Sequence, residues 1–193
     1  MQHDDQQVYL LRHGETRWSL SGQHTGHTDI PLTENGRAAA RALAPALAGV
    51  QFEQVICSPL QRARQTCELA GLDAQALIDA DLAEWNYGDY EGLTIQQIHA
   101  QAPDWLVFRD GCPGGERPDE IGARVDRLIA RVRAVDGKVA LVAHGHILRA
   151  LAARWLGLPV SAGRHFLLDT TTLSVLGYYQ GSGAIERWNA AHL

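Results

Sequence analysis

The stretch Lys138 to His146 reads K-V-A-L-V-A-H-G-H. The run from Lys138 to Ala143 is rich in strand-forming side chains, which is typical of a strand buried on both faces of a sheet. It ends abruptly in His144-Gly145-His146, and the pattern from Ile147 to Leu156 is helical. A buried strand that leads into a helix belongs to a parallel sheet, so we expect the α/β class.

Two other predicted strands also end in polar residues. Val8–Leu11 is followed by Arg12-His13-Gly14, and Gln54–Ser58 is followed at Pro59 by a predicted helix to about Ala70. Ligands bind beyond the carboxyl ends of parallel strands. These strand ends therefore predict the position of a functional site.

The remaining pattern extends the same architecture. Helices are predicted over about Glu34–Ala48, capped by Thr33, over about Asp119–Val135, and from a cap at Thr94 to Ala102. Leu77–Ile78 is a weak strand, and the closing strands are predicted at Thr172–Tyr179 and Ala184–Trp188. We expect a single domain over residues 1–193, a three-layer α/β/α fold with a mainly parallel central sheet.

Composition narrows the classes of partner. The net charge is −5, so no nucleic-acid partner is expected, and no run of about 18 apolar residues predicts a membrane span. Four arginines of the predicted 119–135 helix are expected to form a solvated face: Arg124, Arg127, Arg131 and Arg133. Cys57, Cys67 and Cys112 lack zinc-like spacing, which predicts free thiols and a cytoplasmic location.

Cations and imidazoles gather at the predicted strand ends. They are Arg12, His13, Arg62 and His144, with Glu84 in a loop rich in aromatic residues and glycine. Such a cluster would be costly without an anion, and the planar fork of arginine suits phosphate oxygens. An imidazole directed at phosphorus is a nucleophile, and Glu84 is the nearest candidate to protonate the leaving alkoxide. No Asp or Cys completes a metal site with His144 and His146, so neither metal nor cofactor is expected.

These residues resemble the signature of a known family. L-R-H-G-E-T (Leu11 to Thr16) is similar to that of the histidine phosphatase superfamily, which includes the cofactor-dependent phosphoglycerate mutases. Further matching motifs follow in order: P-L-T-x-x-G from Pro31, S-P-L-x-R-A-x-Q-T from Ser58, L-A-E-W from Leu82, E-G at Glu91, G-G-E from Gly114 and A-H-G from Ala143. The resemblance implies that His13 is the phosphorylated nucleophile, that Arg12, Arg62 and His144 bind the phosphoryl group, and that Glu84 is the proton donor.

The resemblance also bears on the reaction. Mutases of the family carry asparagine where this chain has Ser19. They also carry a longer insertion between the glutamate that donates the proton and the G-E motif. Here the corresponding segment, about 86–117, is a small cap insertion, which favours hydrolysis by water. We therefore expect a phosphatase, with a phosphoglycerate mutase as the alternative. A phospho-ligand-binding protein without turnover is the alternative from another class.

Several stretches are similar to the fungal sedoheptulose-1,7-bisphosphatase branch. They include the motif from Trp18 to Thr33, E-W-x-Y-G-D-Y-E-G from Glu84, and A-H-G-H-x-L-R from Ala143. This likeness implies a small phosphorylated sugar or polyol as substrate. The residues expected to contact it are Ser19, Gln23, Thr25, Gly26, Tyr87, Gly145 and His146. The oligomeric state stays open, a homodimer included.

Overall fold

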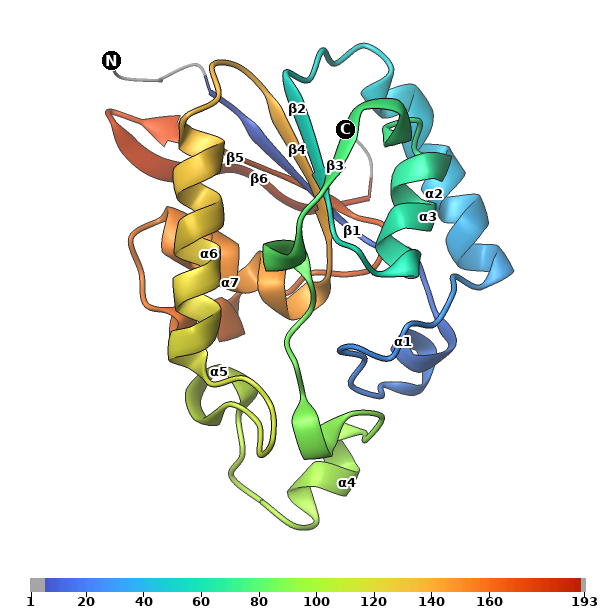
Figure 1. Cartoon of the computed structure of the whole chain (residues 1–193), viewed down its shortest axis with the longest axis vertical. Helices are drawn as coiled ribbons and strands as arrows, with labels where there is room; N and C mark the ends of the chain where they lie inside the picture. The colour runs from blue at the N-terminus through green and yellow to red at the C-terminus, as the bar shows by residue number, and fades with distance from the viewer. Residues whose placement is uncertain (1–5, 192–193) are drawn as a thin grey trace.

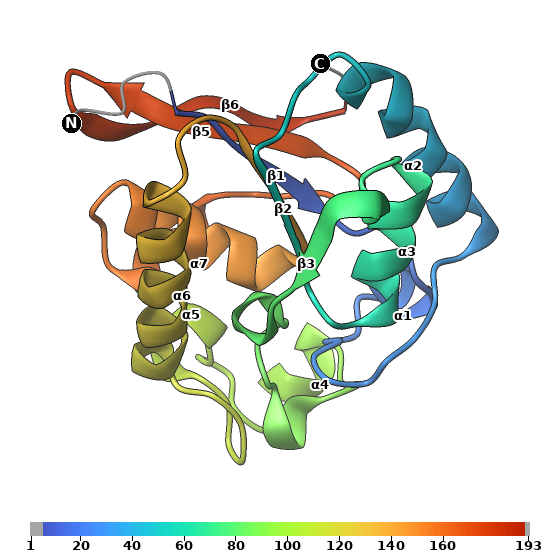
Figure 2. The same cartoon turned by 45° about the horizontal axis from the view of Figure 1, so that its top comes forward.

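A central six-stranded sheet organises the molecule, for which a computed structural model describes residues 6–191 (Figure 1). The strands stand in the order β3-β2-β4-β1-β5-β6, and the first four are mutually parallel. β5 and β6 form an antiparallel hairpin at the other edge, beside β1 (Figure 2). The strands are β1 (Val8–Arg12), β2 (Gln54–Cys57), β3 (Ala76–Ile78), β4 (Val139–Ala143), β5 (Leu173–Tyr179) and β6 (Ser182–Ala190).

Helices cover both faces of this sheet, which confirms the predicted three layers. The α-helices are α1 (Arg17–Ser21), α2 (Glu34–Leu47), α3 (Gln61–Leu69), α4 (Ile95–His99), α5 (Val107–Asp110), α6 (Pro118–Arg133) and α7 (Gly145–Trp155). The 3-10 turns are η1 (Asp73–Gln75), η2 (Ala80–Leu82), η3 (Gly88–Tyr90) and η4 (Val160–His165). α2 and α3 lie on one side of the sheet, and α6 and α7 on the other (Figure 1). Among residues 6–191, no helix is both long and apolar enough to cross a membrane.

The side chains of strand β4 alternate between the cores on the two faces of the sheet. Leu141 packs in the core that α6 and α7 cover, and Val142 packs in the core beneath α2 and α3. All five residues of β4 are buried. Alternate side chains of a strand point to opposite faces, so a strand covered on both faces must be apolar throughout. This burial on both faces explains why the sequence of β4 is continuously apolar.

The predicted elements are present, with small differences at their ends. Thr33 and Thr94 cap α2 and α4 as expected, but α4 ends at His99 rather than Ala102. α1 and α5 were not predicted, because helices of five and four residues are too short to show a periodic apolar stripe. α1 is held instead by a reciprocal capping box between Thr16 and Ser19.

One prediction about α6 was wrong. Arg124 does not lie on a solvated face: its residue is only 8% exposed, and its guanidinium binds main-chain carbonyls and a carboxylate. Arg127, Arg131 and Arg133 are exposed as predicted. Arg127 and Arg131 pair with the carboxylate of Asp81, and Arg133 stacks on the ring of Trp155.

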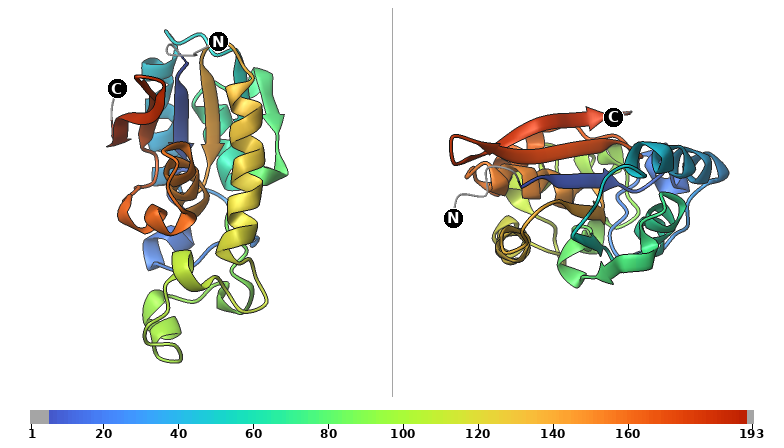
Figure 3. Two further views of the ribbon diagram at one scale, coloured as in Figure 1. Left: turned by 90° about the vertical axis from the view of Figure 1, so that its left-hand side faces the viewer. Right: turned by 90° about the horizontal axis from the view of Figure 1, so that it is seen from above.

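The sheet brings three chain segments together at the carboxyl ends of its parallel strands. β2, β4 and β1 are neighbours, and the backbone N–H groups of Ser58 and His13 donate to carbonyls of β4, at 3.0 Å to Val142 and 2.9 Å to Ala143. The hydrogen-bonded ladder therefore continues into the residues that follow the strands. The segment 86–117, with α4 and α5, lies beyond this edge (Figure 3).

Candidate active site

A cavity of about 150 Å³ opens at the carboxyl edge of the sheet. Three of the five predicted catalytic residues line it: Arg12, His13 and Glu84. Six of the seven predicted substrate contacts also line it: Ser19, Gln23, Thr25, Tyr87, Gly145 and His146. Gly26 lies outside the lining, where its carbonyl accepts from Arg62. The structure thus brings the residues of three distant motifs to one hollow.

His13 follows β1, and its ring is fixed by the next residue. Nδ1 lies 2.7 Å from the carbonyl oxygen of Gly14, which can only accept, so Nδ1 carries the hydrogen and Nε2 has the lone pair. The pKa of His13 lies well below its ordinary value because the ring is buried, and the charges of Arg62 and Arg12 lower it further. The imidazole is therefore neutral at physiological pH.

A glycine is required directly after this histidine. A Cβ at Gly14 would lie 2.7 Å from the carbonyl oxygen of Gly36 at the start of α2. The Gly14 N–H donates to the hydroxyl of Thr66 on α3 at 3.0 Å. The backbone behind His13 is thus held between two helices at a separation that no side chain would allow.

Arg12 supplies the charge nearest to His13 in the sequence. Its Nη1 donates to the carbonyl of Leu168, while Nε is buried and is an unpartnered side-chain polar atom within residues 6–191. Burial lowers the pKa of Arg12, which means that the site holds a poorly solvated cation. Gly145 makes room for it, since a Cβ there would lie 3.3 Å from the Arg12 Cζ. A buried donor without an acceptor is suited to an incoming anion.

Arg62 and His144 lie behind the cavity wall rather than in it. Arg62 Nε donates to Nδ1 of His144 at 3.1 Å, and the guanidinium also donates to the carbonyls of Thr25, Gly26 and Thr28. His144 Nε2 lies 2.7 Å from the hydroxyl of Ser58. Burial, with Arg62 and His13 adding, holds the pKa of His144 well below its ordinary value. The rings of His144 and His13 are 5.1 Å apart between centroids.

Glu84 enters the cavity from the loop between η2 and η3. Its carboxylate accepts three backbone N–H groups, from Trp85 and Ile147 at 2.9 Å and from His146 at 3.0 Å. Two of these donors belong to the first turn of α7, where free N–H groups favour a negative group. The carboxylate is thereby held at the same end of the sheet as His13, and both residues line the cavity.

Tyr87 and His146 form the outer part of the site. The Tyr87 hydroxyl lies 2.5 Å from Nδ1 of His146, and the ring of Phe108 stands edge-on to the imidazole. Burial lowers the pKa of His146 well below its ordinary value and raises that of Tyr87 well above its own. Both side chains are therefore neutral hydrogen-bonding groups.

Four lining residues were not predicted: Gly22, His24, Arg149 and Leu168. His24 is stacked parallel to His146, with 6.1 Å between centroids. Arg149 lies over the ring of Phe108 at 4.8 Å and donates to the carbonyls of Gly163 and Arg164. A signal for Arg149 was present, because it stands three residues after His146 and such pairs share one helix face.

Within residues 6–191, no three or more His, Cys, Asp and Glu side chains gather in a way that could hold a metal ion. Cys57, Cys67 and Cys112 are free and buried in this part of the chain, as expected for thiols.

Comparison with known proteins agrees with this geometry. A sequence model of the histidine phosphatase superfamily (branch 1) matches residues 8–191. An acid phosphatase of Mycobacterium tuberculosis is 41% identical over 178 residues, which cover 90% of this chain and 87% of that protein. The sedoheptulose 1,7-bisphosphatase of Saccharomyces cerevisiae is 37% identical over 184 residues, 78% of this chain and 68% of that protein.

A solved structure is also similar to this chain over almost its whole length. The product of the Mycobacterium tuberculosis open reading frame Rv3214 superposes with a TM-score of 0.93 at 38% identity, covering 97% of this chain and 100% of that one. The sheet order, the R-H-G strand end and the family match over nearly all described residues lead to one assignment. The chain is a member of the histidine phosphatase superfamily, branch 1.

Proposed function

We propose that this protein is a metal-independent phosphatase that hydrolyses phosphate monoesters through a phosphohistidine on His13. The observation that carries the proposal is the state of His13: a neutral ring whose Nδ1–H is bound by Gly14 and whose Nε2 is left as a nucleophile. The names of the relatives, an acid phosphatase and a sugar bisphosphatase, support the same reaction class.

In the first step Nε2 of His13 attacks phosphorus, so an N–P bond forms and the P–O bond to the alcohol breaks. Glu84 donates a proton to the departing alkoxide. Arg12 and Arg62 neutralise the charge that develops on the phosphoryl oxygens. His144 contributes its Nε2–H when a phosphoryl oxygen replaces the Ser58 hydroxyl as its partner.

In the second step water attacks the phosphorus of phosphohistidine. Glu84 takes a proton from this water, the N–P bond breaks, and phosphate leaves with His13 restored to its neutral form. Arginine charges and a protein acid supply what this chemistry needs, so no metal ion or cofactor takes part in the proposed steps.

We propose a small phosphorylated sugar or polyol as the substrate. The cavity offers neutral polar groups beside the phosphoryl site, among them Ser19, Gln23 and the Tyr87–His146 pair. Such groups fit the hydroxyls of a polyol. Arg149 adds a cation at the same cavity, and its guanidinium donates to the main-chain carbonyls of Gly163 and Arg164 rather than to a carboxylate. A second anionic group on the substrate would supply one.

Trapping tests the nucleophile. Brief exposure to substrate labelled in its phosphate, followed by alkali quench, should leave label on the protein that acid releases. His13→Asn should lose both label and turnover. Full activity in His13→Asn would reject the proposal.

Two assays separate the alternatives. Turnover of 4-nitrophenyl phosphate distinguishes an enzyme from a binding protein without catalysis. Incubation of 3-phosphoglycerate with a trace of 2,3-bisphosphoglycerate detects a mutase, and a phosphatase should give phosphate rather than the 2-isomer.

A further inference from the structure

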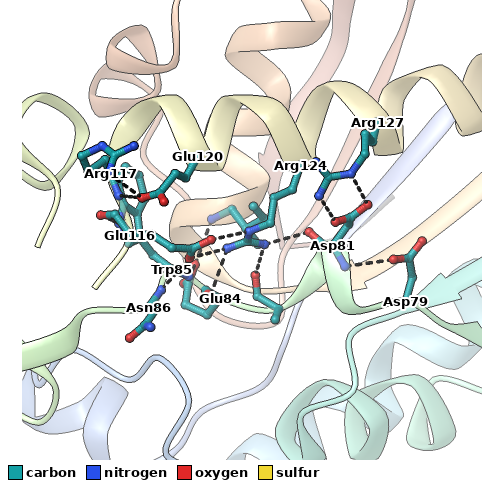
Figure 4. A network of polar contacts seen from close by, with 12 residues as sticks. Asp79, Asp81, Glu84, Trp85, Asn86, Glu116, Arg117, Glu120, Arg124 and Arg127 are labelled. Carbon is teal, nitrogen blue, oxygen red and sulfur yellow. Dashed lines mark hydrogen bonds and ion pairs between the residues drawn. The ribbon is translucent and has the colours of Figure 1, made fainter. Parts of the chain in front are cut away.

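The loop that carries Glu84 has no regular secondary structure from residue 83 to residue 87. No strand ladder holds its peptide groups, and α6 supplies their partners instead (Figure 4). Arg124 Nη1 donates to the carbonyls of Asp81 at 2.8 Å and Ala83 at 2.7 Å, and Nη2 donates to the carbonyl of Glu84 itself at 3.2 Å. One buried side chain thus binds three main-chain carbonyls around the proposed acid.

The other donors of the same guanidinium bind Glu116. Arg124 Nε and Nη2 each lie 2.8 Å from one oxygen of its carboxylate. A guanidinium has five N–H donors, and all of those on Arg124 have an acceptor. A lysine at this position would have three donors on a single nitrogen, so it cannot reproduce this set of contacts.

Glu116 extends the arrangement along the loop. Its Oε2 also accepts the backbone N–H of Asn86 at 2.8 Å, and its own N–H and carbonyl bind the Asn86 carbonyl and the Trp85 indole, both at 2.9 Å. The Arg124–Glu116 pair therefore holds the main chain on both sides of Glu84. The α7 amide groups hold the Glu84 carboxylate from the opposite side.

We infer that Arg124, with Glu116, is a positioning residue for the general acid Glu84. The inference rests on the proposed role of Glu84. A buried ion pair alone is weak support for stability, because apolar residues of similar volume often serve as well. Here three of the five donors bind the carbonyls of Asp81, Ala83 and Glu84, so the pair holds the main chain that carries the acid.

The test uses the dependence of kcat/KM on the leaving group. Alkyl phosphates need a proton on the departing oxygen, whereas 4-nitrophenyl phosphate needs little. In Arg124→Lys we expect the ratio of kcat/KM for an alkyl phosphate to that for 4-nitrophenyl phosphate to fall at least about tenfold. Arg127→Met is the matched control, because Arg127 stands on the same helix and pairs with the Asp81 carboxylate at the surface. Its ratio should stay within about twofold of the wild type.

Glu116→Gln provides a second route if Arg124→Lys does not fold. It keeps the size of the side chain but places an amide against the donors of Arg124 and Asn86, and the same ratio should fall. Combining Arg124→Lys with Glu84→Gln should not lower the ratio below that of Glu84→Gln alone, because both changes act on one proton transfer.

The outcomes separate the two proposals. If Glu84→Gln leaves the ratio unchanged, Glu84 is not the acid and the proposed function fails at that step. If Glu84→Gln lowers the ratio but folded Arg124→Lys and Glu116→Gln do not, positioning by Arg124 is overturned. A fall in both substrates by the same factor also overturns it, because that pattern indicates general disruption.

Discussion

The Nε–H of Arg62 donates to Nδ1 of His144 across 3.1 Å, and this contact determines the state of the histidine. With Nδ1 acting as acceptor, the single hydrogen of the neutral ring lies on Nε2 and is donated to the Ser58 hydroxyl at 2.7 Å. His144 therefore reaches a phosphoryl group only by giving up Ser58. The ring lies behind the cavity wall, with its centroid 5.1 Å from that of His13.

Ser58→Ala tests this exchange. Removing the hydroxyl leaves the buried N–H of His144 without a partner, so the free energy of unfolding should fall by about 1–3 kcal/mol. Vanadate or phosphate should supply the missing acceptor and raise the Tm of Ser58→Ala by more than it raises that of the wild type. Ser21→Ala, at an exposed hydroxyl, is the control. Equal ligand-induced shifts would indicate that His144 does not bind the phosphoryl group.

Gly145→Ala tests the place of Arg12. The added methyl group would lie 3.3 Å from Cζ and 3.4 Å from Nε of Arg12, so the guanidinium must move. We expect the inhibition constant of inorganic phosphate to rise about tenfold, since a charge-assisted hydrogen bond contributes about 1.5–3 kcal/mol. Gly49→Ala has no atom within 4 Å of the new methyl group and should leave the constant unchanged. A variant that binds phosphate normally would show that Arg12 does not contact it.

Arg149→Met tests the substrate class. The methionine keeps the packing on Phe108 but removes the charge. The KM for a sugar bisphosphate should rise at least about tenfold, while kcat/KM for 4-nitrophenyl phosphate should change less than about twofold. Arg154→Met is the control, because Arg154 stands on α7 like Arg149 and forms an exposed ion pair with Asp126 of α6. Equal effects on both substrates would reject a subsite for a second anion.

Stability should decline on mild acidification. Burial holds the pKa of His13, His144 and His146 well below 6.5, so between the lowered values and 6.5 the unfolded chain binds more protons than the folded one. Their contribution is complete above pH 6.5 and is lost as the pH falls below it. Urea unfolding between pH 7.5 and 5.5 should report a proton uptake that grows as the pH falls and approaches about three at pH 5.5, reduced by about one in His146→Gln. A free energy of unfolding that does not change over this range would contradict the buried, neutral state.

The strand ends were predictable because local sequence determines them. An apolar run that stops at Arg12 and His13 can lie in a sheet only up to that point, and the parallel arrangement brings the ends together. His144 was predicted in the same way, and Arg62 was predicted from its place early in the helix that follows the strand ending at Ser58. The contact between Arg62 and His144 was not predicted, because it depends on the rotation of α3 relative to β4.

The position of Arg124 was misjudged for a different reason. It lies three residues after Ile121 and four before Leu128, so its spacing places it on the buried stripe of α6. Its charge favoured a solvated interpretation, and its carbonyl acceptors lie 40 to 43 residues earlier, in η2 and the loop that follows. His24 lies in an irregular segment, where no periodic pattern reveals which side chains face a cavity.

The ladder that continues from β1 and β2 onto β4 has a consequence for refolding. His13 and Ser58 are held by carbonyls of a strand more than eighty residues later in the chain, so the reactive centre joins distant parts of the sequence. Such long-range pairings form late, since loop closure must precede them. Recovered turnover after dilution from denaturant is therefore a kinetic marker for completion of the whole sheet, and it should lag behind the return of helical circular dichroism.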